Sequence, residues 1–157
     1  MTRLEGGCAC GAVRYRLNDE PISVNNCHCR LCQRQTGTGS ALNANIEIDR
    51  LDHLSGSLSA HDLPTGSGGT QTIFRCAGCG TAVWSYYPRF GPLAAAVRVG
   101  TFDDPSALHV DAAIFVTSRL PWLSPATPAF DGYYDPADVL PDHRLKRFRA
   151  LQEKAGS

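Results

Sequence analysis

Seven cysteines in three short clusters are the residues of this chain most able to do chemistry. The clusters are Cys8-Ala9-Cys10, Cys27-His28-Cys29-Arg30-Leu31-Cys32 and Cys76-Ala77-Gly78-Cys79. Structural zinc sites are closed by four ligands, whereas reactive zinc sites hold fewer protein ligands and keep one position open. The first and last clusters together supply four thiols, and the middle cluster supplies three. This grouping predicts two zinc ions, one for the fold and one for the chemistry.

The four-thiol site is predicted from two turn-like pairs, Cys8 with Cys10 and Cys76 with Cys79. A glycine follows each pair, and glycine tolerates the positive φ that such a turn requires. One zinc would join these two distant segments, so metal binding here would contribute folding free energy. The cysteines could instead be small buried apolar residues, although their paired spacing makes this the weaker interpretation. An iron–sulfur cluster is disfavoured because the Cys-Pro ending of bacterial ferredoxins is missing.

The three-thiol site, formed by Cys27, Cys29 and Cys32, predicts a different chemistry. A helical turn after Cys29 would bring Cys32 back to the same ion. Three soft, charged donors quench the Lewis acidity of zinc, so this ion suits another soft ligand better than it suits water activation. An incoming thiol would bind as the nucleophilic thiolate. The trio is therefore predicted to be the catalytic site of a thiol reaction with an electrophile.

Two other interpretations of the trio remain open. A fourth protein ligand could close the site and make it structural, and the candidates are an acidic residue, His53, His61 and His109. The trio could also be redox-active, although a thioredoxin-like context is lacking. We expect His28 to pack or to support a ligand rather than to bind the metal. A zinc deaminase is excluded because the chain has no His-x-Glu sequence and no Pro-Cys-x-x-Cys sequence.

The elements that position these clusters are predicted to be mainly strands. The expected strands are residues 12–17, 22–25, 40–48, 51–58, 70–75, 83–87, 93–99 and 109–116, with a turn at Asp49-Arg50. Strands at short spacing with Gly and Pro between them favour antiparallel sheets over βαβ units. Residues 64–69 are expected to form a flexible loop, and residues 66–69 could also serve as a mobile lip over the open zinc, although a plain hairpin loop is the simpler interpretation. Residues 121–136 are expected to be irregular, and a helix is predicted over residues 142–154 with Asp142 as its N-cap.

Length and composition predict a single domain over residues 1–157. The formal net charge is zero, which argues against a nucleic-acid or membrane partner. The first residues lack a signal-like apolar core, and no apolar run approaches the length of a membrane span. We therefore expect a cytoplasmic protein, in which clustered cysteines favour metal over disulfides.

Several segments resemble the glutathione-dependent formaldehyde-activating enzyme family, which includes centromere protein V. The matching segments are residues 7–15 (GCACGAVRY), 27–37 (CHCRLCQRQTG), 74–80 (FRCAGCG) and 99–105 (VGTFDDP), with a further echo at residues 114–118 (IFVTS) and Pro121-Trp122. All seven cysteines align in order with the family pattern. The resemblance covers residues 7–122, which is most of the chain.

The resemblance implies a β-tent fold in which zinc holds the sheets together. It implies a structural zinc on Cys8, Cys10, Cys76 and Cys79, and a catalytic zinc on Cys27, Cys29 and Cys32. It further implies a carbon–sulfur lyase reaction in which glutathione and formaldehyde form S-(hydroxymethyl)glutathione, or in which that adduct is cleaved. The chain departs from the family where Gln33-Arg34 replaces a frequent basic pair and where Thr101-Phe102 replaces a leucine-bearing form. Arg34 could neutralise the zinc–thiolate charge or bind a substrate carboxylate, although a solvated arginine is commoner.

A second functional hypothesis is a non-catalytic, zinc-stabilised interaction module of the same fold. Its contact surface would be the basic last helix, which carries Arg144, Lys146, Arg147 and Arg149, although a solvated helix is the simpler reading. Four aromatic residues could wall a pocket but are expected to belong to the core: Trp84, Tyr86, Tyr87 and Trp122. The fourth position on the central zinc distinguishes the two hypotheses. A protein ligand there favours the module, and an open position favours the enzyme.

Overall fold

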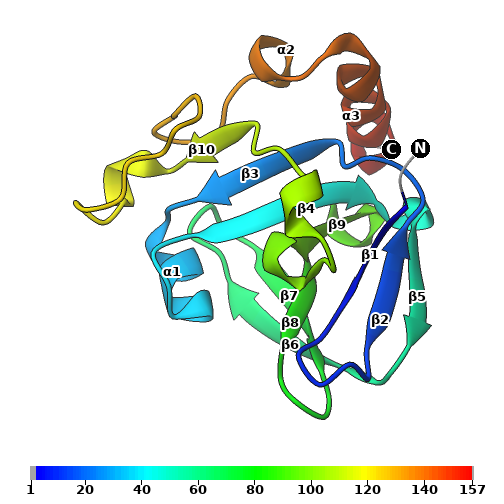
Figure 1. The fold of residues 1–157 in the computed structure, drawn as a ribbon. Coiled ribbons are helices and arrows are strands. Elements are labelled where there is room, and N and C mark those ends of the chain that lie inside the picture. The colour runs from blue at the N-terminus through cyan, green and yellow to red at the C-terminus, as the bar shows by residue number, and fades with distance from the viewer. Residues whose placement is uncertain (1–2, 157) are drawn as a thin grey trace.

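Two sheets and a C-terminal helix make up residues 3–156, the part of the chain that the computed structural model describes (Figure 1). The smaller sheet has the order β1-β2-β5, with β1 at Leu4–Gly7, β2 at Arg14–Leu17 and β5 at Leu51–Ser55. The larger sheet has the order β10-β3-β4-β9-β8-β7-β6. Its strands are β3 Ser23–Cys27, β4 Ala41–Glu47, β6 Leu58–Pro64, β7 Thr70–Cys76, β8 Ala82–Tyr86, β9 Ala94–Arg98 and β10 Ala112–Ile114. The predicted mainly β class is confirmed.

The helical elements are short apart from the last one. They are α1 Arg30–Thr36, α2 Pro136–Val139 and α3 Asp142–Gly156, with 3-10 turns η1 Ile48–Arg50, η2 Gly91–Leu93, η3 Val99–Thr101, η4 Pro105–Ala107 and η5 Val116–Ser118. None of the helices in the described part of the chain has the length and apolar character needed to cross a membrane.

Three local predictions differ from the structure. The strand predicted at 51–58 is two strands, because the chain turns at Gly56, whose φ is +86° and whose ideal Cβ would lie 2.5 Å from the Ala12 carbonyl oxygen. The edge strand β6 extends to Pro64, so the hairpin loop is residues 65–69. The strand β10 pairs in parallel with β3, whereas all other named strand pairs in the described residues are antiparallel.

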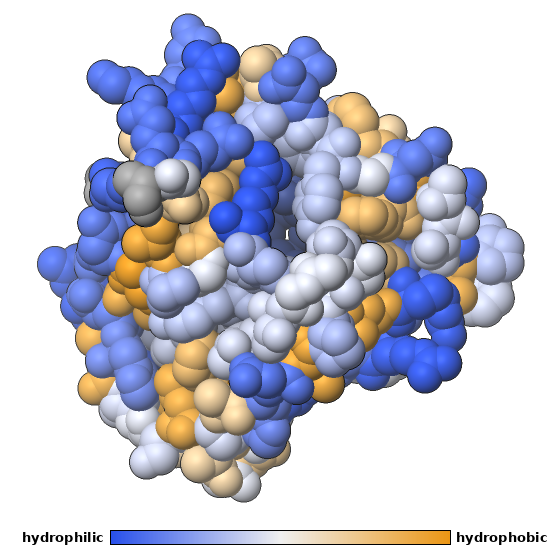
Figure 2. Space-filling model, turned by 180° about the vertical axis from the view of Figure 1, so that it is seen from behind, coloured by the Kyte–Doolittle hydropathy of each residue, from blue (hydrophilic) through white to orange (hydrophobic). Residues whose placement is uncertain are grey.

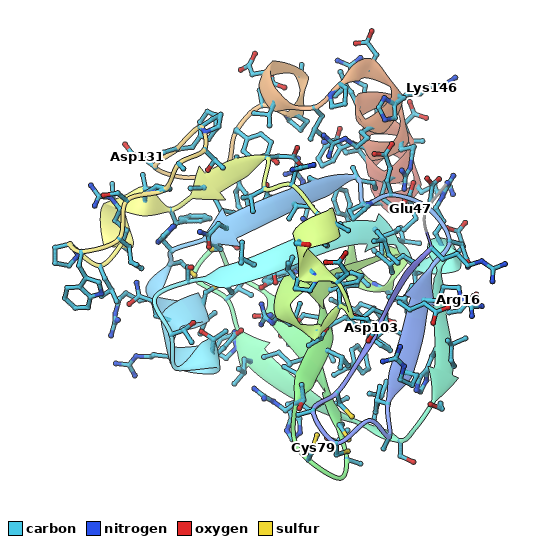
Figure 3. All side chains as sticks on the ribbon, in the orientation of Figure 1. Arg16, Glu47, Cys79, Asp103, Asp131 and Lys146 are labelled. Carbon is cyan, nitrogen blue, oxygen red and sulfur yellow. The ribbon has the colours of Figure 1, made fainter. Side chains whose placement is uncertain are left out.

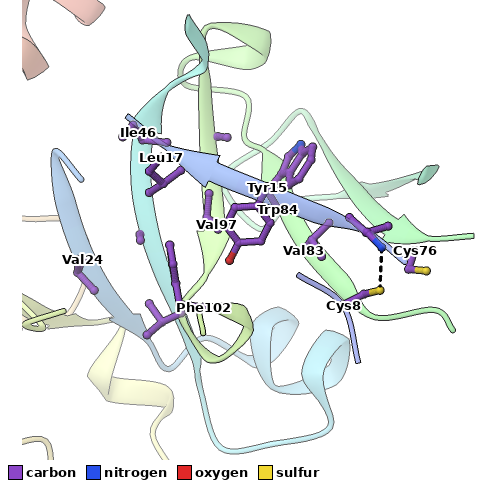
Figure 4. Close-up of a cluster of buried hydrophobic side chains, with 14 residues drawn as sticks. Cys8, Tyr15, Leu17, Val24, Ile46, Cys76, Val83, Trp84, Val97 and Phe102 are labelled. Atoms are coloured by element: carbon purple, nitrogen blue, oxygen red, sulfur yellow. Dashed lines mark hydrogen bonds between the residues drawn. The ribbon is translucent and has the colours of Figure 1, made fainter. Parts of the chain in front are cut away.

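The largest core cluster lies between the two sheets (Figure 4). Tyr15 is fully buried there and meets Trp84 and Phe102 edge to face, with ring centroids 5.9 and 5.5 Å apart. Aromatic pairs in this geometry stabilise a core beyond their buried area. Cys8 and Cys76 belong to the same cluster, so one cysteine site is continuous with the core.

The C-terminal helix α3 covers one end of the larger sheet. The predicted helix is confirmed, although it begins at Asp142 rather than after it, and Phe148 and Leu151 are buried beneath it. Two of its four predicted surface cations are instead fixed to the sheet region. Arg144 donates to Asp111 at 2.9 and 2.8 Å, and Arg147 donates to Glu47 at 2.8 and 2.6 Å. The expectation of a wholly solvated basic face is therefore wrong for these two residues.

Candidate metal centres and the adjoining cavity

The first and last cysteine clusters meet at the end of the molecule opposite α3, where Cys79 lies (Figure 3). Cys8 and Cys10 lie on the turn between β1 and β2, whereas Cys76 ends β7 and Cys79 lies on the turn between β7 and β8. The four Sγ atoms lie within 4.8 Å of one another. Gly11 and Gly80 have φ of +81° and +78°, which agrees with the role predicted for these glycines.

The spacing of these sulfurs fits zinc. Four sulfurs at about 2.3 Å from a tetrahedral ion are about 3.8 Å apart. The Sγ atom of Cys10 lies 3.5 Å from that of Cys8 and 3.8 Å from that of Cys76, a residue 66 positions away. The backbone N–H of Val13 donates to Cys8 Sγ at 3.2 Å, and that of Cys79 donates to Cys76 Sγ at 3.5 Å. The bond from Val13 lowers the pKa of the Cys8 thiol and so favours the thiolate, which is the form that binds metal.

The middle cluster forms where β3 runs into α1, on the other side of the molecule from β2 (Figure 1). Cys27 ends β3, Cys29 is the N-cap of α1, and Cys32 lies in the first turn of that helix. The Cys32 N–H donates to Cys29 Sγ at 3.3 Å. The helical turn after Cys29 thus gathers the three Sγ atoms within 4.8 Å, as the sequence predicted.

A buried glutamine stabilises this segment, and sequence reasoning did not identify it. Gln33, which is 5% exposed, donates through Nε2 to the backbone carbonyls of His28 and Ser118, both at 2.9 Å. This side chain ties α1 to η5 and holds the start of the helix in place. His28 is buried between these elements and is not part of the sulfur group.

The trio is incomplete as a closed metal site. Within residues 3–156, its group of potential ligands contains three cysteines and no histidine or carboxylate. His53, His61 and His109, the predicted alternatives, are exposed side chains outside this group. Hydrogen bonds from Cys27 and Cys32 lower the pKa of Cys29 far below its ordinary value, so the trio holds negative charge that a cation would balance. Both cysteine groups fit zinc, and they differ in the number of donors.

The trio opens into a cavity of about 420 Å³, on the hollowed face that is turned away from the viewer of Figure 1 (Figure 2). All three cysteines line the cavity. Its far end is apolar and includes Ile22, Phe148 and Leu151. Residues 65–67 of the hairpin loop also line the cavity, so two residues of the predicted lip, Gly66 and Ser67, lie at the cavity. Cavities of this volume, largely apolar with a few polar groups, are typical small-molecule sites.

The candidate side chains around the trio fall into two groups. Arg34 lies on α1 but is exposed and is not among the residues that line the cavity, whereas Arg30 and Arg89 do line it. Among the four aromatic residues, Trp84 is a core residue as predicted, and Trp122 is 74% exposed, which contradicts its predicted burial. Tyr87 lines the cavity rather than the core between the sheets.

Comparisons with known proteins found the following similarities. The sequence profile of the family described as "Glutathione-dependent formaldehyde-activating enzyme" matches residues 3–118, a range that includes all seven cysteines. A Halomonas elongata protein named "Putative glutathione-dependent formaldehyde-activating enzyme" is 32% identical over 118 residues, which is 68% of this chain and 73% of that protein. A crystal structure of a Rhodobacter sphaeroides protein is similar with a TM-score of 0.49 and 20% identity, over 80% of this chain and 98% of that chain.

Proposed function

Because the chain belongs to the glutathione-dependent formaldehyde-activating enzyme family, we propose that it is a carbon–sulfur lyase acting on the adduct of a glutathione-like thiol and a formaldehyde-like aldehyde. The single observation that carries this proposal is the cysteine trio, which lacks a histidine or carboxylate partner in the described residues and lines a cavity. In this proposal, Cys27, Cys29 and Cys32 hold a catalytic zinc. Cys8, Cys10, Cys76 and Cys79 hold a structural zinc.

The proposed reaction needs no oxidant or reductant. A thiol and an aldehyde combine so that a carbon–sulfur bond forms, the carbonyl π bond breaks, and the proton lost by the thiol ends on the oxygen. The reverse reaction releases the aldehyde. A zinc held by three thiolates would supply an open, soft position that favours the deprotonated form of a substrate thiol. The trio itself fixes where the reacting sulfur must lie, and the cavity wall orients the rest of the substrate.

The charge of the cavity suits an anionic substrate such as glutathione, which carries carboxylates. Two arginines line the cavity, and no aspartate or glutamate does. The Arg89 guanidinium lies 4.9 Å from the centroid of the Phe148 ring and 5.4 Å from that of Phe90, and no ion pair engages it within the described residues. The rings hold this cation in place while leaving its N–H groups for a ligand. We assign a substrate carboxylate to Arg89.

Arg89→Ala is expected to raise the KM for glutathione about tenfold with kcat nearly unchanged, because it removes a charge-assisted contact far from the reacting atoms. The matched control is Arg34→Ala, the arginine that sequence reasoning favoured, and we expect it to leave both constants unchanged. Steady-state kinetics with varied glutathione measures both variants. A higher KM in Arg34→Ala alone would contradict the assignment to Arg89.

The proposed function is tested directly on the zinc-loaded wild-type protein. NMR exchange spectroscopy follows the interconversion of glutathione and S-(hydroxymethyl)glutathione in the presence of formaldehyde. The exchange rate is expected to rise in proportion to the protein concentration. A rate equal to that of the protein-free mixture, from protein that holds both metal ions, would contradict the proposal.

The cysteines and the C-terminal helix α3 suit a cytoplasmic enzyme better than an interaction module. None of the seven cysteines forms a disulfide, which agrees with a reducing compartment. The contact surface that the interaction hypothesis requires is reduced, because Arg144 and Arg147 of α3 form ion pairs with Asp111 and Glu47. We therefore propose small-molecule partners and no nucleic-acid partner.

A further inference from the structure

Two polar groups on the cavity wall have no hydrogen-bond acceptor within the described residues. The hydroxyl of Tyr87 and Nε2 of Gln71 are both buried, and both residues line the cavity. Buried polar groups are nearly always hydrogen-bonded, and leaving one unpaired costs about 1–3 kcal/mol. Two such groups beside one cavity indicate that a ligand completes them.

The pairing of β7 with β8 leads to Gln71 on β7 and to Tyr87, the residue that directly follows β8. The antiparallel pairing of β7 with β8 places Thr72 opposite Tyr86. Continuing this register by one residue places Gln71 opposite Tyr87, on the other face of the sheet from Thr72 and Tyr86. Residues directly opposite in such a pair lie close enough for their side chains to act together. The two unpaired groups therefore form one site.

A buried arginine fixes which end of the Gln71 amide points to the cavity. Arg98 is 8% exposed, and a guanidinium can only donate hydrogen bonds. Its Nη2 donates to Gln35 Oε1 at 3.1 Å, and Gln35 Nε2 donates to Gln71 Oε1 at 2.6 Å. Reversing either amide would place two donors against each other. The donor end of Gln71 is thus the end left unpaired at the cavity.

The same arginine orients a second amide on this wall. Arg98 pairs with Asn43 in the β4–β9 register, and its Nη1 donates to Asn43 Oδ1 at 2.6 Å. Asn43 also lines the cavity, and its remaining NH₂ group is again a donor. Arg98 therefore orients the Asn43 amide directly and the Gln71 amide through Gln35, so that the NH₂ groups of both point away from Arg98.

Tyr87 completes the donor group next to the trio. Burial, the largest cause, raises the pKa of its hydroxyl above the ordinary value, and Cys32 raises it further, whereas the charge of Arg98 and a hydrogen bond with Arg98 lower it. The net shift is upward, so the hydroxyl keeps its proton. The lining of the cavity contains no carboxylate that would accept this proton. The hydroxyl is therefore available to donate to a ligand that sits at the cysteine trio.

We propose that Tyr87 and Gln71 donate hydrogen bonds to the aldehyde oxygen of the substrate as the carbon–sulfur bond forms. This inference rests on the proposed function. The thiolate electron pair forms the new bond, the carbonyl π pair moves onto the oxygen, and that oxygen gains the proton that the thiol lost. Donors fixed in place by Arg98 stabilise this developing charge at no reorganisation cost. The carbonyl of the aldehyde would thus lie between the trio and the β7–β8 wall.

Tyr87→Phe is the primary test, in zinc-loaded protein. The variant removes a hydroxyl whose proton has no acceptor in the protein, although its oxygen interacts with Arg98, so we expect unchanged zinc content and little change in thermal stability. We expect kcat to fall about 100-fold with the KM for glutathione nearly constant. Tyr86→Phe is the matched control, because it removes a hydroxyl from the neighbouring residue that packs on Phe74, with ring centroids 4.8 Å apart. We expect that control to keep wild-type kinetics.

A binding measurement gives a second readout that does not depend on turnover. Calorimetric titration compares glutathione alone with glutathione in excess formaldehyde, where the hydroxymethyl adduct forms in solution. The preference of the protein for the adduct is expected to drop roughly tenfold in Tyr87→Phe, the loss of one hydrogen bond to the oxygen. Gln71→Met should act in the same direction and also lower stability, since it leaves Gln35 Nε2 unpaired.

The results separate this inference from the proposed function. If Tyr87→Phe keeps both the wild-type kcat and the wild-type preference for the adduct, the donor role is overturned. If the wild-type protein binds glutathione but does not accelerate adduct formation, the proposed function fails. In that case the inference is tested only by the preference of the protein for the hydroxymethyl adduct over glutathione. An equal preference in the wild type and in Tyr87→Phe overturns it.

Discussion

Replacing Cys32 by serine is expected to abolish turnover and to remove one zinc while the rest of the fold persists. The variant leaves two thiols, Cys27 and Cys29, which is too few for a stable zinc site. Changes to residues that only support a metal ligand cost about 10–100-fold, so loss of a ligand should cost at least about 1,000-fold in kcat/KM. The cost in stability is small by comparison, because Cys32 packs in a minor cluster with Cys27, Ala41 and Ile114. We expect a loss of roughly 1–2 kcal/mol in the free energy of unfolding.

The measurement pairs zinc content per folded chain with the rate of adduct formation. Arg34→Ala serves as the control on the same helix, because its side chain is exposed and lies outside the cavity lining. A Cys32→Ser protein that keeps two zinc ions and a rate near that of the wild type would contradict the catalytic assignment. A Cys32→Ser protein that does not fold would contradict the assignment of a catalytic role to the trio and a structural role to the four-cysteine site.

Cys76→Ser is expected to leave little folded protein, whereas Cys32→Ser is expected to keep the fold and lose activity. Cys76 is 2% exposed, belongs to the core between the sheets, and joins the β7–β8 turn to the β1–β2 turn. Structural zinc supplies about 10–16 kcal/mol in small modules, which equals or exceeds the total stability of an ordinary domain, about 5–15 kcal/mol. Losing a ligand of this site therefore removes most of the margin that keeps the chain folded.

Circular dichroism and the yield of soluble protein measure this effect, with Cys32→Ser as the matched cysteine variant from the other site. The expected order of thermal stability is wild type, then Cys32→Ser, then Cys76→Ser. A soluble, fully folded Cys76→Ser protein that has lost one zinc but melts at the wild-type temperature would contradict the structural assignment.

The cysteine sites were predictable because their signals are local. Each pair is held by a turn of a few residues, and glycines at positions 11 and 80 mark the positive φ of those turns. The α3 helix was predictable for a similar reason, since Phe148 and Leu151 recur at helical spacing and are both buried. These features depend on neighbouring residues, which a sequence displays directly.

The cavity wall was not predictable because it depends on pairing between distant strands. Asn43, Gln71 and Arg98 lie on three strands, and only the register of the sheet brings them together. Most of the edge strand β6 was missed because its residues are largely exposed and because the alternation of apolar and polar residues that starts at Leu58 breaks at His61-Asp62. Arg34 was singled out because it follows the trio in sequence, and nothing in the sequence pointed to Arg89, which the fold places at the cavity.

The central claim is that the chain holds two metal ions of which only the one at the trio responds to a thiol. Cobalt substitution followed by absorption spectroscopy measures this most directly, with glutathione titrated into the wild type and into Cys32→Ser. We predict two ions per chain and a glutathione-dependent spectral change in the wild type, and one ion with no such change in Cys32→Ser. A wild-type spectrum that does not change with glutathione, although both ions are bound, would contradict the account.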